Sequence, residues 1–86
     1  MAWKIEFTPA AAKQLKKIGP EDGRRIIRFL QENVREDPFR QGKVLKGALR
    51  EFWRYRIGDF RILARIEGER FVVLIVNVGH RREVYR

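Results

Sequence analysis

Arginines recur at alternate positions in the segment FWRYRIGDFRILARI, and their spacing is the feature of this sequence that could do chemistry. Side chains alternate between the two faces of a strand, so Arg54 and Arg56 share a face of the first run of residues. A two-residue turn at Gly58-Asp59 would then place Arg56 opposite Arg61. Like charges directly across a strand pair are destabilising, so we expect this face to hold an anion.

The choice of arginine indicates which anion. No lysine follows Lys46, and every strongly basic residue beyond it is an arginine. A guanidinium group can hold two phosphate oxygens at once and stays protonated, so it stabilises added negative charge but accepts protons poorly. The pattern therefore favours phosphate binding, with a merely solvated basic face as the alternative.

Composition limits the other possibilities. The chain has 86 residues, which suits one domain, and a formal net charge of +9, which favours nucleic acid as a partner and an acidic protein as the second choice. It has no cysteine and one histidine, so we expect no metal site and no other cofactor. No segment has the length and apolar character of a signal peptide or a membrane span, so we expect a cytoplasmic protein without membrane contact.

Hydrophobic periodicity and turn residues predict six elements in one domain, 1–86. In chain order they are a strand over 2–8, a helix from Pro9 closed by Gly19, a helix from Pro20 to Asp37-Pro38, and strands over 52–57, 60–66 and 71–78. Residues 39–50 predict a loop with a short extended piece around Val44 and Leu45. The order β-α-α-β-β-β predicts an α+β fold, in which an αα-hairpin covers one face of a mostly antiparallel four-stranded sheet.

The tail VGHRREVYR follows an apolar strand and the LKG…WRYRIGDFRILARI block. This combination resembles the RelE branch of the RelE/ParE superfamily of toxins from bacterial and archaeal toxin–antitoxin systems, over essentially the whole chain. The resemblance implies a RelE-like microbial ribonuclease-type fold and a ribosome-dependent endoribonuclease, an mRNA interferase that cuts mRNA in the ribosomal A site. It also implies a cognate acidic, RelB-like antitoxin, a ribosome with mRNA and 16S rRNA as target, and a free toxin that is monomeric.

The resemblance also implies site residues. The catalytic positions of the family fall on Arg54, Arg56, Arg61, Arg81 and Tyr85. Well-known members carry lysines where this chain has Arg54 and Arg56, and arginine keeps the charge but gives up an easily donated proton. Tyr85 is the favoured general base, because surrounding guanidinium groups would favour its phenolate. Further contacts with RNA are expected from Lys46, Arg65, His80 and Arg82.

Three alternatives remain beside this interpretation. The ParE branch of the same superfamily poisons DNA gyrase and does not cut RNA. A non-catalytic RNA-binding module would need the same basic face and no base. A decayed toxin would keep the fold and the antitoxin but lose the activity, which the arginines at two customary lysine positions make worth testing.

Overall fold

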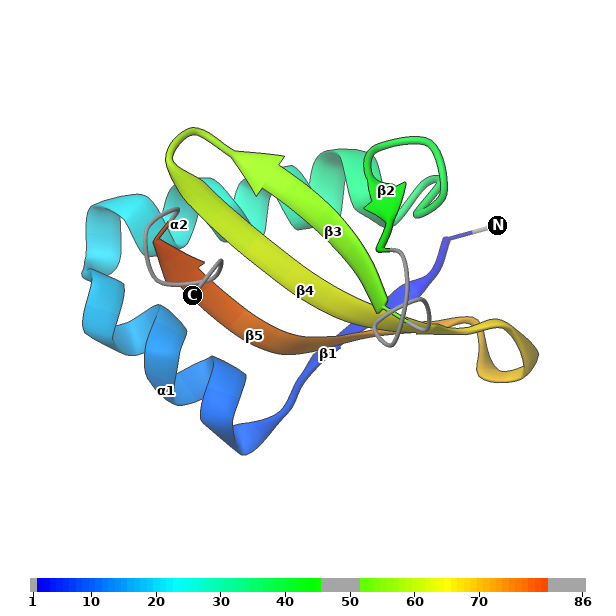
Figure 1. Ribbon diagram of the computed structural model, residues 1–86, viewed down its shortest axis with the longest axis horizontal. Coiled ribbons are helices and arrows are strands. Elements are labelled where there is room, and N and C mark those ends of the chain that lie inside the picture. The colour runs from blue at the N-terminus through cyan, green and yellow to red at the C-terminus, as the bar shows by residue number, and fades with distance from the viewer. Residues whose placement is uncertain (1, 46–51, 81–86) are drawn as a thin grey trace.

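The computed structural model describes residues 2–45 and 52–80, and its helices lie together on one face of a twisted sheet (Figure 1). The elements are β1 (Lys4–Phe7), α1 (Pro9–Ile18), α2 (Pro20–Phe29), η1 (Leu30–Val34), β2 (Lys43–Val44), β3 (Phe52–Ile57), β4 (Phe60–Glu67), η3 (Gly68–Arg70) and β5 (Val72–His80). This arrangement confirms the predicted α+β fold. None of the helices in the described part of the chain is long and apolar enough to cross a membrane.

Among the described residues the sheet has five strands, in the order β1-β5-β4-β3-β2, so the prediction of four strands was wrong by one. The extra strand is β2, which pairs antiparallel with β3 through only two residues, Lys43 opposite Arg54 and Val44 opposite Trp53. Two residues are too few to show a strand period, although the sequence predicts an extended piece there. Strand β1 runs parallel to β5, and the other pairs are antiparallel.

The two helices are joined by a single residue, as their sequence signals predict. The side chain of Thr8 caps α1 by accepting a hydrogen bond from the Ala11 amide at 3.1 Å. Gly19 ends α1 with a φ of 110°, a conformation that suits glycine, and α2 begins directly after it. The second helix continues through the π-helical turn η1 and stops before Asp37-Pro38.

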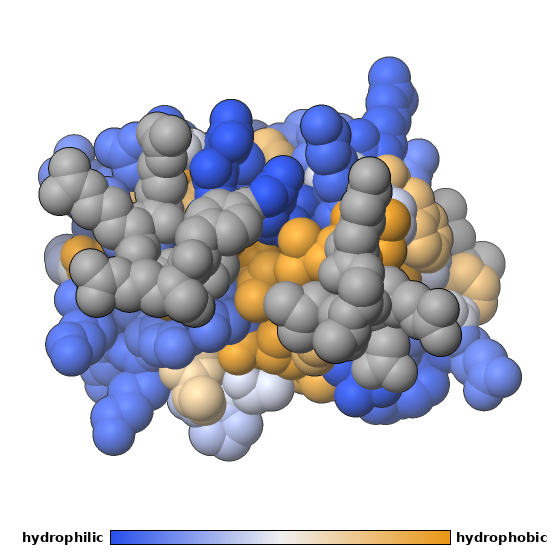
Figure 2. All heavy atoms as spheres, viewed as in Figure 1, coloured by the Kyte–Doolittle hydropathy of each residue, from blue (hydrophilic) through white to orange (hydrophobic). Residues whose placement is uncertain are grey.

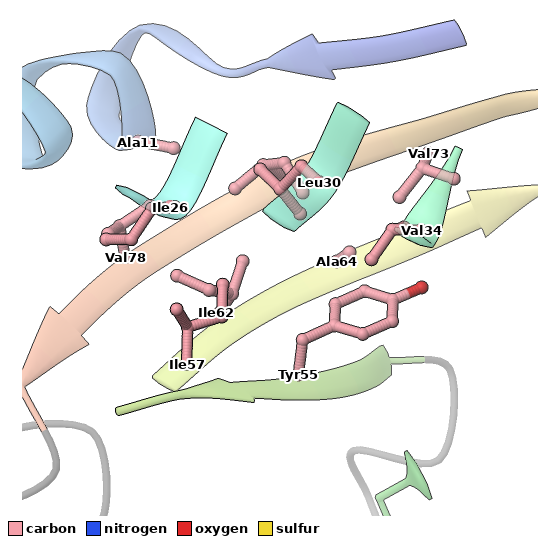
Figure 3. Packing of buried hydrophobic residues seen from close by; sticks show 11 residues of the cluster. Ala11, Ile26, Leu30, Val34, Tyr55, Ile57, Ile62, Ala64, Val73 and Val78 are labelled. Atoms are coloured by element: carbon pink, nitrogen blue, oxygen red, sulfur yellow. The ribbon is translucent and has the colours of Figure 1, made fainter. Parts of the chain in front are cut away.

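The core lies between the helices and the inner face of the sheet (Figure 3). The helices contribute Ile26, Leu30 and Val34, which face side chains from β3, β4 and β5. The strands contribute Tyr55, Ile57, Ile62, Ala64, Val73, Ile75 and Val78. The neighbouring Ile27 is 36% exposed, because it lies one position round the helix from Ile26 and points away from the core.

Tyr55 ties the sheet to the segment that follows the helices. Its ring is buried, and its hydroxyl donates a hydrogen bond of 2.8 Å to the buried Pro38 carbonyl. Burial, together with the nearby carboxylate of Asp37, raises the pKa of Tyr55 far above its ordinary value. The phenol therefore stays neutral and keeps its proton for this hydrogen bond.

The connection between β4 and β5 also differs from the sequence prediction. The strand predicted to start at Phe71 starts instead at Val72, and Phe71 adopts a left-handed conformation with a φ of 53°. Its ring is 47% exposed and packs 5.1 Å from the ring of Trp3. Because a left-handed phenylalanine is rare, sequence propensity gives no indication of this turn.

Replacing Tyr55 by phenylalanine tests the contribution of its hydroxyl. Tyr55→Phe should lower the free energy of unfolding by about 1 to 2 kcal/mol, because the buried Pro38 carbonyl loses its donor while the ring still fills the core. Urea denaturation followed by circular dichroism measures this change. An unchanged midpoint would show that the hydrogen bond contributes nothing to stability.

Candidate functional site

The turn between β3 and β4 sets the register of the candidate site. Gly58 has a φ of 59°, which fits a two-residue hairpin with glycine at its first central position. The register that follows pairs Ile57 with Phe60 and Arg56 with Arg61. This confirms the predicted cross-strand pairing of the two arginines.

Four arginines share the sheet face turned away from the helices, and we call this set the arginine face: Arg54, Arg56, Arg61 and Arg65. Its members differ in exposure. Arg56 and Arg65 are exposed and Arg54 is partly exposed, whereas Arg61 on the central strand is only 4% exposed. Figure 2 looks onto this side of the molecule and shows strongly hydrophilic side chains beside an apolar area.

The charges on this face are separated along the sheet. Within the described strands its carboxylates are Glu6 and Glu67, which both pair in register within the first three residues of β5, far from the turn at Gly58. Both are already compensated, Glu6 by Lys4 at 3.6 Å and Glu67 by Arg70 at 2.7 Å. Apart from Asp59 in the turn itself, the charged residues described at the turn end of this face are all arginines. A ligand there would therefore meet positive charge.

A β-bulge brings a polar side chain to the arginine face that sequence reasoning missed. Leu63 pairs with Asn77 and the next residue, Ala64, pairs with Ile75, so Val76 is the extra residue of β5. The bulge turns Val78 into the core and puts Asn77 on the open face, in the same cross-strand row as Arg54. A bulge depends on both strands, so the sequence of β5 alone could not indicate it.

Helix α1 holds the strand in place just after the bulge. The amide of Val78 donates a hydrogen bond of 2.7 Å to the side-chain oxygen of Gln14. The same cross-strand row begins on β2 with Lys43, a basic residue that the sequence analysis did not single out. The row therefore runs from Lys43 through Arg54 and Leu63 to Asn77, with two cations and an amide for polar contacts.

His80 lies elsewhere. Its register partner is Phe60, which packs against the core, and the two rings meet edge to face at 5.8 Å. This register gives His80 the facing of the core side chains, whereas Gly79 is the residue beside Arg61. The structure therefore does not bring His80 together with the arginine face. Four other predicted site residues lie outside the described residues: Lys46, Arg81, Arg82 and Tyr85.

Comparison with known families gives one match over nearly the whole chain. The ParE toxin of type II toxin–antitoxin systems, parDE, matches residues 5–85. Among curated proteins, Toxin RelG of Mycobacterium tuberculosis is 33% identical over 86 residues, covering 100% of this chain and 99% of its own.

Solved structures of the same kind share the fold. The toxin–antitoxin complex RelBE2 from Mycobacterium tuberculosis contains a chain that superposes with a TM-score of 0.89 at 30% identity, covering 96% of this chain and 95% of that one. The isolated E. coli RelE toxin gives a TM-score of 0.79 at 26% identity, with coverages of 98% and 92%.

The energetic cost of placing two arginines opposite each other can be measured as a change in the free energy of unfolding. Arg56→Gln should raise the free energy of unfolding by about 0.2 to 1 kcal/mol at low salt, because it removes the like charge opposite Arg61. The gain should shrink at high salt, where exposed charges are screened. Arg65→Gln is the matched control, since Arg65 lies between Phe52 and Leu74 and faces no charge. Equal effects of the two variants would contradict cross-strand repulsion.

Proposed function

Because the chain belongs to the ParE toxin family of type II toxin–antitoxin systems, within the RelE/ParE superfamily, we propose that it is a ribosome-dependent endoribonuclease that cuts mRNA in the ribosomal A site. The observation that carries this proposal is the pairing of Arg56 with Arg61 on the same face as Arg54. A gyrase poison has no need of such a phosphate-binding constellation. Cleavage of mRNA would inhibit translation and so account for toxicity.

The arginine face suits the charge that develops during RNA cleavage. When the 2′-oxygen attacks the phosphorus, the phosphorane intermediate carries extra negative charge, which Arg54, Arg56 and Arg61 would stabilise. The residue Arg61 is only 4% exposed, and a charge shielded from water interacts more strongly with a nearby phosphate than one in water. The P–O5′ bond then breaks to leave a 2′,3′-cyclic phosphate, and the 5′-oxygen takes up a proton.

Proton removal from the 2′-hydroxyl needs a base, and arginine cannot serve. We assign this role to Tyr85, on the resemblance of the tail VGHRREVYR to the RelE branch. The same resemblance assigns Arg81, like the three strand arginines, to stabilisation of the phosphorane charge. The other tyrosine of the chain, Tyr55, cannot take the role because it is buried in the core and its hydroxyl donates a hydrogen bond to the Pro38 carbonyl. Tyr85 is therefore the one tyrosine of the sequence that can serve as the general base.

The partners follow from the same relationship. The RelBE2 and archaeal RelE-RelB structures are complexes of toxin with antitoxin, and we propose a cognate RelB-like antitoxin for this chain as well. A net charge of +9 suits both an acidic antitoxin and the ribosome, whose RNA and bound mRNA are polyanions. We further propose that the protein acts in the cytoplasm.

Inhibition of DNA gyrase is the second candidate, because the matching family is described as ParE. The two functions make different demands on the chain. Cleavage requires a general base of the protein that takes the proton from the RNA 2′-hydroxyl. A gyrase poison requires neither this general base nor a group of arginines that binds phosphate. The same protein preparation, tested for mRNA cleavage and for gyrase supercoiling, separates them.

Mapping cuts on translated mRNA tests the proposal directly. Primer extension should reveal cuts at A-site codons of mRNA held on ribosomes and none on naked RNA. Tyr85→Phe should reduce the cleavage rate by at least about a hundredfold, the lower range for loss of a general base. Ribosome binding by the variant serves as the control. An uncut message under conditions of intact ribosome binding would rule out the nuclease.

Titration of the two tyrosines tests the identity of the base. The raised pKa of Tyr55 keeps this phenol neutral, so any phenolate absorbance that appears below pH ~10, the ordinary tyrosine value, must come from Tyr85. The cleavage rate should rise with pH and level off above the same pKa, because the base acts when deprotonated. Tyr85→Phe should remove this absorbance, and Tyr55→Phe should preserve it. Its persistence in Tyr85→Phe would contradict the assignment.

A further inference from the structure

We propose that a hollow between α2 and the β3–β4 turn binds a backbone phosphate of RNA, as a second anion site beside the arginine face. This inference rests on the proposed function, since it extends the surface that would contact RNA. The hollow has a volume of about 310 Å³. Three arginines line it, Arg25, Arg28 and Arg56.

The geometry of the hollow depends on Gly58. Arg25 and Arg28 are three residues apart on α2 and therefore lie on the same side of the helix. The guanidinium of Arg25 packs onto the turn, where its nitrogens would lie 3.0 Å from a Cβ atom at Gly58. Only glycine combines this close approach with the positive φ of the turn.

The charges in the hollow are poorly balanced. Three arginines meet one carboxylate, that of Glu32, and the amide of Asn33 adds a further polar group. Within residues 2–45 and 52–80, Arg25, Arg28 and Arg56 form no ion pair with a carboxylate within 4.0 Å. Three cations beside a single carboxylate leave a net positive charge, so an anion that enters the hollow gains favourable electrostatic interactions.

Phosphate fits this environment better than a carboxylate-bearing peptide. The hollow shares Arg56 with the arginine face, so one RNA strand could contact both with neighbouring phosphates. Planar guanidinium groups bind phosphate oxygens in pairs, and three of them around one group suit a phosphate with several exposed oxygens. An acidic antitoxin segment is the competing ligand, and the experiment below distinguishes it.

The test compares two double variants that lose the same charge. Arg25→Gln/Arg28→Gln empties the hollow of two cations, and Lys13→Gln/Lys17→Gln removes two exposed cations of α1 that do not line it. The probe is a fluorescent single-stranded 2′-O-methyl oligoribonucleotide, which has the phosphates of RNA but no 2′-hydroxyl to attack. Its affinity is measured by anisotropy over a range of salt concentrations, and circular dichroism confirms folding.

We expect the hollow variant to bind the probe about three- to tenfold more weakly, with a salt slope smaller by about 0.7, the value for one phosphate contact on a single strand. The α1 variant should change less. Equal losses in both variants, or no binding of the probe by the unmodified protein, would overturn the proposal. If the hollow variant loses affinity for poly-glutamate but keeps its affinity for the oligoribonucleotide, the hollow binds an acidic protein instead.

Cleavage assays keep this inference separate from the proposed function. The hollow variant should require more ribosome-bound mRNA for half-maximal rate, with the maximal rate unchanged, because neither α2 arginine touches the reacting atoms. If the unmodified protein cuts mRNA and the variant behaves identically, the hollow proposal fails alone. If the unmodified protein binds the probe through the hollow yet cuts nothing, the nuclease fails and the anion site stands.

Discussion

The register of the β3–β4 hairpin is the constraint on which the rest of the structure depends. Because side chains alternate along both strands, the turn at Gly58 decides which residues enter the core and which face outward. In the observed register Tyr55 and Ile62 pack against the helices, while Arg56 and Arg61 meet on the other face. A slip of one residue would bury the arginines and expose the core, so the same pairing fixes both stability and the candidate site.

The facing arginines lower the stability of the fold, and we attribute their presence to anion binding. Arg56 and Arg61 face each other across the hairpin, an arrangement that a structure selected only for stability would avoid. The helix side compensates with close packing and with the hydrogen bond from Tyr55 to Pro38. A domain of 86 residues has little stability in reserve, so we regard the retained repulsion as a sign of function.

The sequence predicted those features that depend on strict alternation or on strong local signals. The Arg56–Arg61 pair and the helix start at Pro9 are of this kind, because each follows from neighbouring residues. Features set by distant contacts escaped prediction. The bulge at Val76 needs the register of β4, and the facing of His80 follows from the bulge. The strand β2 was predicted only as a short extended piece, because two residues are too few to show a period. The roles of Arg81 and Tyr85 rest on the family resemblance.

Gly58 links the two anion-binding surfaces physically. Its positive φ allows the tight turn that brings Arg56 opposite Arg61, and its missing side chain leaves the space that the Arg25 guanidinium occupies. Alanine there would strain the turn and press on Arg25 together, so a single glycine serves both the arginine face and the hollow. Since Arg56 borders both surfaces, positive charge continues around the end of the hairpin from the sheet to α2. A ligand that exploits this continuity must be a chain of regularly spaced anions, which describes a nucleic-acid backbone better than any small phosphate.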